Sequence, residues 1–177
     1  MPTATTGHFS LQYGNIGFGS RRAARAVYYI FVILLALVAA TSTAAAAEIR
    51  FERSELTVVT AKGPVRFDVE LATDDRQRAQ GLQHRKAMAA DAGMLFLFPE
   101  PQVVDMWMKN THLSLDMIFI RRDGHIVSIA EATKPLSLDI VSSGAQASAV
   151  LEVLAGTAKR LGIVPGDRVI HPLLGRR

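Results

Sequence analysis

The chain has 177 residues, of which 49% are hydrophobic, and a formal net charge of +4. Residues 1–47 hold three of the 20 lysines and arginines and none of the 16 acidic residues, so residues 48–177 carry a net charge of +1. That balance gives no support for a nucleic-acid-binding face or a polyanion-binding surface. Cysteine is absent, which excludes disulfides, thiolate metal sites and a cysteine nucleophile.

The N-terminal segment has the layout of a secretory signal. Arg21, Arg22 and Arg25 precede an apolar run over 26–40, and small residues fill 41–47. This pattern predicts cleavage after Ala47 and an exported, periplasmic or otherwise extracytoplasmic protein. The alternative is a retained membrane anchor, because 27–47 is about long enough to cross a bilayer.

Residues 48–177 have the length of one ordinary domain, and their first elements are predicted as a β-hairpin and a helix. The segments 56–60 and 65–71 read as strands, the second with strict alternation of apolar and polar residues. Thr73, Asp74 and Asp75 can cap a short helix that ends at Gly81.

The rest of the chain predicts further short strands. They are expected at 93–98, 103–109, 115–122, 125–132, 150–154 and 168–170, with a loop over 134–149 and a helical turn at 156–161. Asp123-Gly124 predicts a two-residue hairpin turn. The fold class is therefore mainly β: a single-domain sandwich or a partly closed barrel with one or two short helices.

Counting back from the Asp123-Gly124 turn gives a predicted strand register. It pairs Arg122 with His125, Ile120 with Val127, Ile118 with Ile129 and Asp116 with Glu131. If the preceding strands form a hairpin over 110–115, Lys109 faces Asp116 and Trp107 faces Ile118. One face of the sheet then carries a polar row of Lys109, Asp116 and Glu131 beside the tryptophan.

This row is the predicted ligand site, with a tryptophan-floored pocket next to it. Opposed carboxylates repel and a nearby lysine relieves the repulsion, which is a route to a perturbed proton affinity. The alternative is a structural ion pair of Lys109 and Asp116, with Trp107 filling the core. The predicted site residues are Trp107, Lys109, Asn110, Thr111, Asp116 and Glu131.

Glu152 is a second unusual position, because it is a carboxylate in a strand that should be buried. It is expected either to pair with an arginine such as Arg78 or to face water at a sheet edge.

The five histidines show no spacing typical of metal ligands, so no metal or cofactor is predicted.

Several motifs together resemble the domain of unknown function family number 192. They are Arg78-x-x-Gly81-Leu82, Gly93-Met94-Leu95-Phe96, Trp107-Met108-Lys109-Asn110-Thr111, Leu115-Asp116, Gly124, Val150-Leu151-Glu152, Gly156 and Gly166-Asp167. The resemblance covers about residues 55–171 and implies a small, mainly β domain, often exported or membrane-tethered, with no established activity. Gln83, Met106 and Ser114 depart from the family pattern of methionine, an aromatic residue and proline.

Three functions are compatible with the sequence. The first is a binding module for a polar small molecule, glycan or peptide end, using the Trp107 and Lys109 cluster. The second is an enzyme doing acid–base chemistry with Asp116 or Glu131 and Lys109. The third is a structural or assembly partner in the cell envelope.

Overall fold

The computed structural model describes residues 25–26, 28–32 and 48–175. Residues 25–26 and 28–32 are helical, and the helices of this described part include none with the length and apolarity needed to cross a bilayer. The rest of the predicted leader, including the expected cleavage point after Ala47, lies outside the described residues. Residues 48–175 belong to a separate compact unit.

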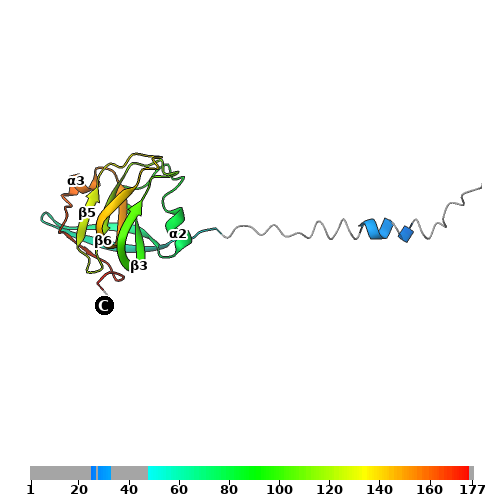
Figure 1. Ribbon diagram of the computed structural model, residues 1–177, viewed down its shortest axis with the longest axis horizontal. Helices are drawn as coiled ribbons and strands as arrows, with labels where there is room; N and C mark the ends of the chain where they lie inside the picture. The colour runs from blue at the N-terminus through cyan, green and yellow to red at the C-terminus, as the bar shows by residue number, and fades with distance from the viewer. Residues whose placement is uncertain (1–24, 27, 33–47, 176–177) are drawn as a thin grey trace, which may run out of the picture. The chain divides into compact units, whose positions relative to one another are not determined.

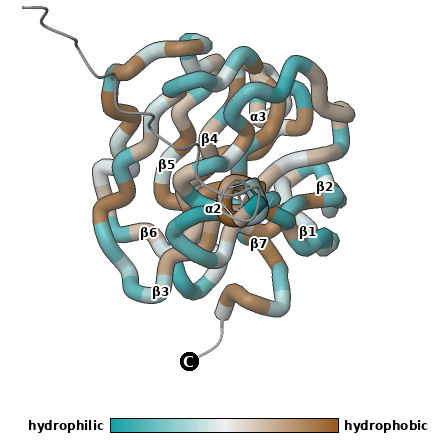
Figure 2. Tube along the Cα trace, turned by 90° about the vertical axis from the view of Figure 1, so that its right-hand side faces the viewer, coloured by the Kyte–Doolittle hydropathy of each residue, from teal (hydrophilic) through white to brown (hydrophobic). Residues whose placement is uncertain are grey.

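The domain is mainly β, as predicted, and is built on one curled seven-stranded sheet that forms a half-barrel (Figure 1). Its elements are β1 (Glu52–Thr60), β2 (Gly63–Ala72), α2 (Asp75–Gln80), β3 (Ala92–Met106), β4 (Leu115–Ile120), β5 (Ile126–Ala130), β6 (Val141–Leu154), α3 (Thr157–Leu161) and β7 (Arg168–Ile170). The strand order is β5-β4-β6-β3-β2-β1-β7. Figure 2 shows the strands curling round, with β1 and β2 on one side and β3 and β6 on the other.

The first hairpin forms as the alternation predicts. β1 and β2 are antiparallel, and Thr60 pairs with Gly63 across the turn. Phe67 and Val69 are buried while Arg66 and Asp68 are exposed, so β2 is the expected half-buried strand. α2 then connects β2 to β3, which pair in parallel.

Strand β4 is buried along its whole length, and its two faces contribute to different hydrophobic clusters. Ile118 and Ile120 belong to one cluster, with residues from β1, β2 and β6. Met117 and Phe119 belong to the other, with residues from β3 and the loops that follow α2 and β3. A strand with apolar side chains on both faces lies between two packed layers, as the sequence indicates for 115–122.

The hairpin at Asp123-Gly124 differs from the predicted two-residue turn. Ile118 pairs with Ile129 as expected, but a register shift after Phe119 pairs Ile120 with Ile126 instead of Val127. Across the turn, the backbone N–H of Arg121 donates to the carbonyl of His125 at 2.9 Å, so the predicted pairing of Arg122 with His125 is wrong.

Gly124 is required here because the chain approaches β7 closely. Its φ is +89°, and a Cβ at this position would lie 2.5 Å from the carbonyl oxygen of Val169. The backbone N–H of Val169 donates to Gly124 at 2.8 Å, and that of Ile126 donates to Asp167 at 2.9 Å. β7 is therefore hydrogen-bonded to β1 on one side and to the start of β5 on the other, which partly closes the half-barrel.

The longest strands differ most from the prediction. β3 covers the predicted strand 93–98 and the first part of the predicted strand 103–109, with register shifts between Leu97 and Gln102 and between Val103 and Asp105. It ends at Met106, so residues 107–109 lie in the loop that follows and their prediction as strand is wrong. β6 begins at Val141, inside the predicted loop. Residues 142–149 are rich in Ser, Gly and Ala and carry no strand pattern, yet they extend the sheet because β3 supplies a partner along their length.

Candidate functional site

The predicted polar row is not formed, because the strands that were to carry it are not neighbours. β4 lies between β5 and β6, whereas β3 lies between β6 and β2. Asp116 pairs with Val153 of β6 and not with Lys109. The error comes from assuming that consecutive strands pair: a strand from much later in the chain, β6, inserts between them.

Asp116 has a structural role in the domain. Its side chain is fully buried, and its carboxylate accepts hydrogen bonds from the backbone N–H groups of Ala132 (2.9 Å), Gly156 (3.2 Å) and Ala158 (2.9 Å). Gly156 is the N-cap of α3 and has no side chain to cap the helix. Asp116 supplies the missing acceptor from β4 and ties α3 to the sheet.

Two other predicted site residues lie on the surface. Glu131 is exposed just after the end of β5. Asn110 is exposed with φ at +56°, and its amide donates to Gln83 Oε1 at 3.1 Å while its carbonyl accepts from the N–H of His84 at 2.8 Å. Asn110 therefore joins the loop after β3 to the loop after α2.

Trp107, Lys109 and Thr111 do come together, at a cavity of about 280 Å³ between α2, β3, β6 and the loop after β3. Its walls include apolar side chains of Leu82, Phe96, Phe98 and Met106. Thr111 is buried in the wall, and its hydroxyl donates to the carbonyl of Lys109 at 3.2 Å. The cavity thus combines apolar walls with a few polar groups, the composition expected of a small-molecule site.

Trp107 lies at the mouth of this cavity and does not fill the core. Its side chain is 54% exposed, and the Lys109 ammonium lies 5.4 Å from the centroid of its ring. The predicted ion pair of Lys109 with Asp116 is therefore replaced by a cation–π contact within the loop. Asp105, which is exposed, also lines the cavity.

Glu152 is the buried acid of the cavity. It is 4% exposed, and its cross-strand neighbours are Met94 on β3 and Met117 on β4, both fully buried. Directly paired residues share a face of the sheet, so Glu152 lies between two methionines. Burial raises the pKa of Glu152 to about 8, and the described residues provide no hydrogen bond or neighbouring charge that offsets this shift. Glu152 is therefore protonated and neutral at pH 7.

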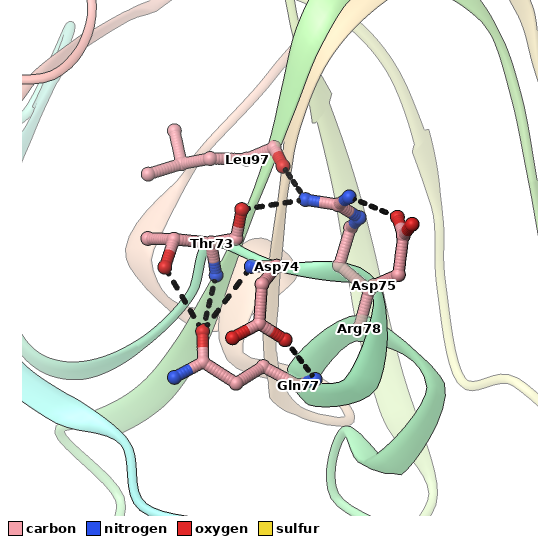
Figure 3. Close-up of polar contacts among 6 residues, drawn as sticks. All are labelled: Thr73, Asp74, Asp75, Gln77, Arg78 and Leu97. Atoms are coloured by element: carbon pink, nitrogen blue, oxygen red, sulfur yellow. Dashed lines mark hydrogen bonds and ion pairs between the residues drawn. The ribbon is translucent and has the colours of Figure 1, made fainter.

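The expected pairing of Glu152 with Arg78 does not occur, because the Arg78 guanidinium is committed elsewhere (Figure 3). It donates to the carbonyls of Thr73 at 2.8 Å and Leu97 at 2.7 Å, and it forms an ion pair with Asp75. These contacts hold α2 against β3. The capping box of Asp74 and Gln77 fixes the start of the same helix, as the sequence predicts for Asp74.

Gly93 allows β3 to approach β6 next to the acid. A Cβ at Gly93 would lie 2.6 Å from the carbonyl oxygen of Glu152. That oxygen is backbone, so a side chain at Gly93 would force the two strands apart.

Within residues 48–175, as in the rest of the described chain, no group of three or more His, Cys, Asp or Glu side chains is arranged to hold a metal ion.

Glu152 is thus the residue that the predicted site set omits. The sequence identifies it as unusual, but its membership of the cavity depends on the pairing of β6 with both β3 and β4. Of the six predicted residues, three line the cavity, and Asn110, Asp116 and Glu131 are not among its lining residues.

Comparisons with known proteins place the chain in a family. Residues 57–171 match the model of the family DUF192, described as "Uncharacterized ACR". A crystal structure of a proposed transcription regulator from Sinorhizobium meliloti 1021 is 48% identical, with a TM-score of 0.68, over 70% of this chain and 97% of that one. A structure of a protein of unknown function from Novosphingobium aromaticivorans DSM 12444 is 34% identical, with a TM-score of 0.66, over 74% of this chain and 99% of that one.

No curated protein gives a significant match. The family match spans most of the domain, and both solved structures share its fold over two thirds or more of the chain. The protein therefore belongs to DUF192, a family of uncharacterised proteins.

Proposed function

We propose that the domain binds a small ligand in the cavity between α2, β3 and β6, and that Glu152 contacts this ligand. The observation that carries the proposal is an acid that is 4% exposed, lines a cavity and has no partner among the described residues. Among the described residues, Ser148 Oγ is the one fully enclosed side-chain oxygen without a partner, so the unpartnered Glu152 carboxyl group is accessible from the cavity. A ligand that supplies the missing partner is a physical reason for a fold to keep such a group.

The surroundings of Glu152 support the proposal. The cavity of about 280 Å³ is near the lower end of the size of known ligand pockets, which indicates a compact ligand. Phe96 and Phe98 provide apolar contact area, and Trp107 at the mouth provides an exposed ring. The only tryptophan of the chain therefore lies where a bound ligand would change its fluorescence.

The test uses a panel of compact probes: alkylammonium ions, alkyl carboxylates, alkyl amides and monosaccharides. Binding is followed by Trp107 emission and by thermal unfolding. Ala79 is exposed on α2 and lines the cavity, so Ala79→Phe should block the cavity with little effect on the fold. A probe at one hundred times its Kd should stabilise the wild type by about 3 kcal/mol and leave the blocked variant unchanged.

A second variant, Glu152→Gln, removes the acid from the cavity. Its matched control is Glu131→Gln, which makes the same chemical change at an exposed glutamate outside the cavity. It should bind like the wild type. Equal stabilisation of wild type and Ala79→Phe would mean that the probe binds elsewhere. If no class of probe affects either Trp107 emission or unfolding, the proposal is wrong.

The protonation state of Glu152 favours a second function, acid–base catalysis. A carboxylic acid with a pKa near 8 is protonated at neutral pH and can donate a proton to a bound substrate. An enzyme would lose turnover on Glu152→Gln while it retained substrate binding. A binding protein would show no turnover in either form.

A further inference from the structure

We infer that the ligand of this cavity is a small organic ammonium ion, with its charged nitrogen at Glu152, its hydrocarbon part against the phenylalanines, and Asp105 as a second acid of the lining. The inference rests on the proposed function, because it names the chemical class that the same cavity would take. It is carried by the charges that remain unpaired in the cavity, by the contact at Trp107 and by the apolar walls.

The charged groups that line the cavity leave an excess of acid. The charged groups are Asp75 and Arg78 from α2, Asp105 from β3 and Lys109 from the following loop, and the neutral acid Glu152 of β6 adds a further carboxyl group. Arg78 and Asp75 pair with one another through Arg78 Nη2, and Arg78 Nη1 donates to the carbonyls of Thr73 and Leu97. Lys109 is then the one unpaired cation among these lining groups, against two carboxyl groups, Asp105 and Glu152.

The mouth of the cavity already holds an ammonium group. Lys109 Nζ lies 5.4 Å from the centroid of the Trp107 ring, within the range of a cation–π contact. Both side chains are exposed, so Lys109 can leave the ring without loss of buried structure. An ammonium ligand would compete with Lys109 for the face of Trp107 on its way to Glu152.

The buried acid Glu152 favours a cationic ligand over an anionic one. A carboxylate or phosphate would meet two acids, Glu152 and Asp105, and the unpaired cation of the lining is Lys109 at the mouth, because Arg78 already binds Asp75 and two carbonyls. An ammonium ion would instead ionise Glu152 and provide its missing partner, which stabilises a buried charge. Leu82, Phe96 and Phe98 suit a short hydrocarbon chain attached to the nitrogen.

Proton release distinguishes an ammonium ligand from a neutral one. Burial raises the pKa of Glu152 to about 8, so an ammonium ion that binds below pH 8 must displace its proton. Well below pH 8, each further pH unit then weakens binding about tenfold. An alkylammonium ion, like a lysine side chain, stays protonated up to about pH 10. No histidine lines the cavity, so Glu152 is the lining group expected to titrate near pH 8.

The experiment is calorimetry of the full-length protein with n-pentylammonium, 1-pentanol and pentanoate, which share a chain length and differ in charge. We expect n-pentylammonium to bind about 50-fold more weakly at pH 6 than at pH 8, where Glu152 is already half ionised. It should release about one proton at pH 6, measured in two buffers of different ionisation enthalpy. Glu152→Gln should abolish the proton release, and Glu131→Gln should leave it unchanged.

Two further variants test the mouth of the cavity and do not touch the buried acid. Asp105→Asn removes an exposed carboxylate and should weaken n-pentylammonium binding. Lys109→Gln frees the Trp107 ring and should strengthen it. Circular dichroism of each variant confirms that it is folded.

The outcomes separate this inference from the proposed function. If 1-pentanol or pentanoate binds in a Glu152-dependent way and n-pentylammonium does not, the ligand class is wrong and the proposed function stands. If n-pentylammonium binds Glu152→Gln as tightly as the wild type and releases no proton, the inference is overturned. If none of the three probes binds and the wider panel also fails, both are overturned.

Discussion

The backbone N–H of Ala158 in α3 donates a 2.9 Å hydrogen bond to the carboxylate of Asp116 in β4. Two more backbone N–H groups, of Ala132 and Gly156, donate to the same buried carboxylate. Asp116→Ala would leave three donors without an acceptor. We expect the free energy of unfolding to fall by about 3 kcal/mol or more, measured by urea denaturation.

The control for that change is Glu131→Gln, at an exposed acid, which should alter stability by less than about 0.5 kcal/mol. Asp116→Asn keeps one oxygen and should lie between the two. A folded Asp116→Ala with wild-type stability would contradict the structural role.

Stability should fall as the pH rises toward 8, because of Glu152. Burial raises the pKa of Glu152 from 4.5 to about 8, so between these values the folded protein holds a proton that the unfolded chain has lost. The free energy of unfolding then decreases by about 1.4 kcal/mol per pH unit. From pH 6.5 to 8 the expected loss is about 2 kcal/mol, measured by urea denaturation at each pH.

Glu152→Gln should remove this dependence, because glutamine is uncharged at every pH. The variant is expected to match or exceed the wild type in stability at pH 8. A wild-type slope that persists in Glu152→Gln would place the responsible group elsewhere.

Acidification should destabilise the domain through His171. This side chain is 5% exposed; its Nε2 lies 3.0 Å from Ser54 Oγ, and its Nδ1 accepts from the N–H of Leu173 at 3.2 Å. Burial lowers the pKa of His171 below its usual 6.5. The unfolded chain therefore gains a proton first, and stability is lost as the pH falls below 6.5.

The measurement for His171 is the melting temperature of wild type and His171→Gln between pH 7 and 5. The variant keeps a neutral side chain, so its melting temperature should depend less on pH. Identical slopes in the two proteins would rule out His171 as the cause.

Ser148 and Ser143 offer a matched pair of hydroxyl deletions in β6. Ser148 Oγ is buried and finds no hydrogen-bond partner among the described residues. Ser143 Oγ donates to Ala145 at 2.6 Å and accepts from the N–H of Val104 at 2.9 Å. Ser148→Ala should leave stability unchanged or raise it by about 1 kcal/mol, whereas Ser143→Ala should lower it by about 1–2 kcal/mol.

We propose that the protein is exported and that its leader is removed after Ala47. Intact-mass measurement of protein recovered from the periplasm should then give a chain that begins at Glu48. A mass that retains residues 26–47, in the membrane fraction, would favour the anchor instead.

Local sequence patterns predicted the parts of the fold that depend on neighbouring residues. The alternation at Val65, Phe67 and Val69 predicted the first hairpin, and Asp74 predicted the start of α2. The burial of β4 on both faces also followed from its composition. Each of these features is decided by contacts within a few residues or by hydrophobicity alone.

Those local patterns do not predict which strands pair when the strands are far apart in the sequence. Nothing local indicates that β6 lies between β3 and β4, and this one insertion separates Lys109 from Asp116 and brings Glu152 to the cavity. The exposure of Trp107 has the same origin, because Leu151 of β6 takes the place beside Ile118 that the prediction gave to Trp107. Sequence motifs thus located the region of the site, while the pairing of distant strands determined its members.

The contact of β7 with both β1 and the start of β5 has a consequence for solution behaviour. A sheet edge with free N–H and carbonyl groups is a template for pairing with another chain. Three residues of β7, Arg168–Ile170, shield parts of two edges at once. Loss of the C-terminal segment would therefore uncover both edges together, and self-association between molecules would follow before any change at the cavity.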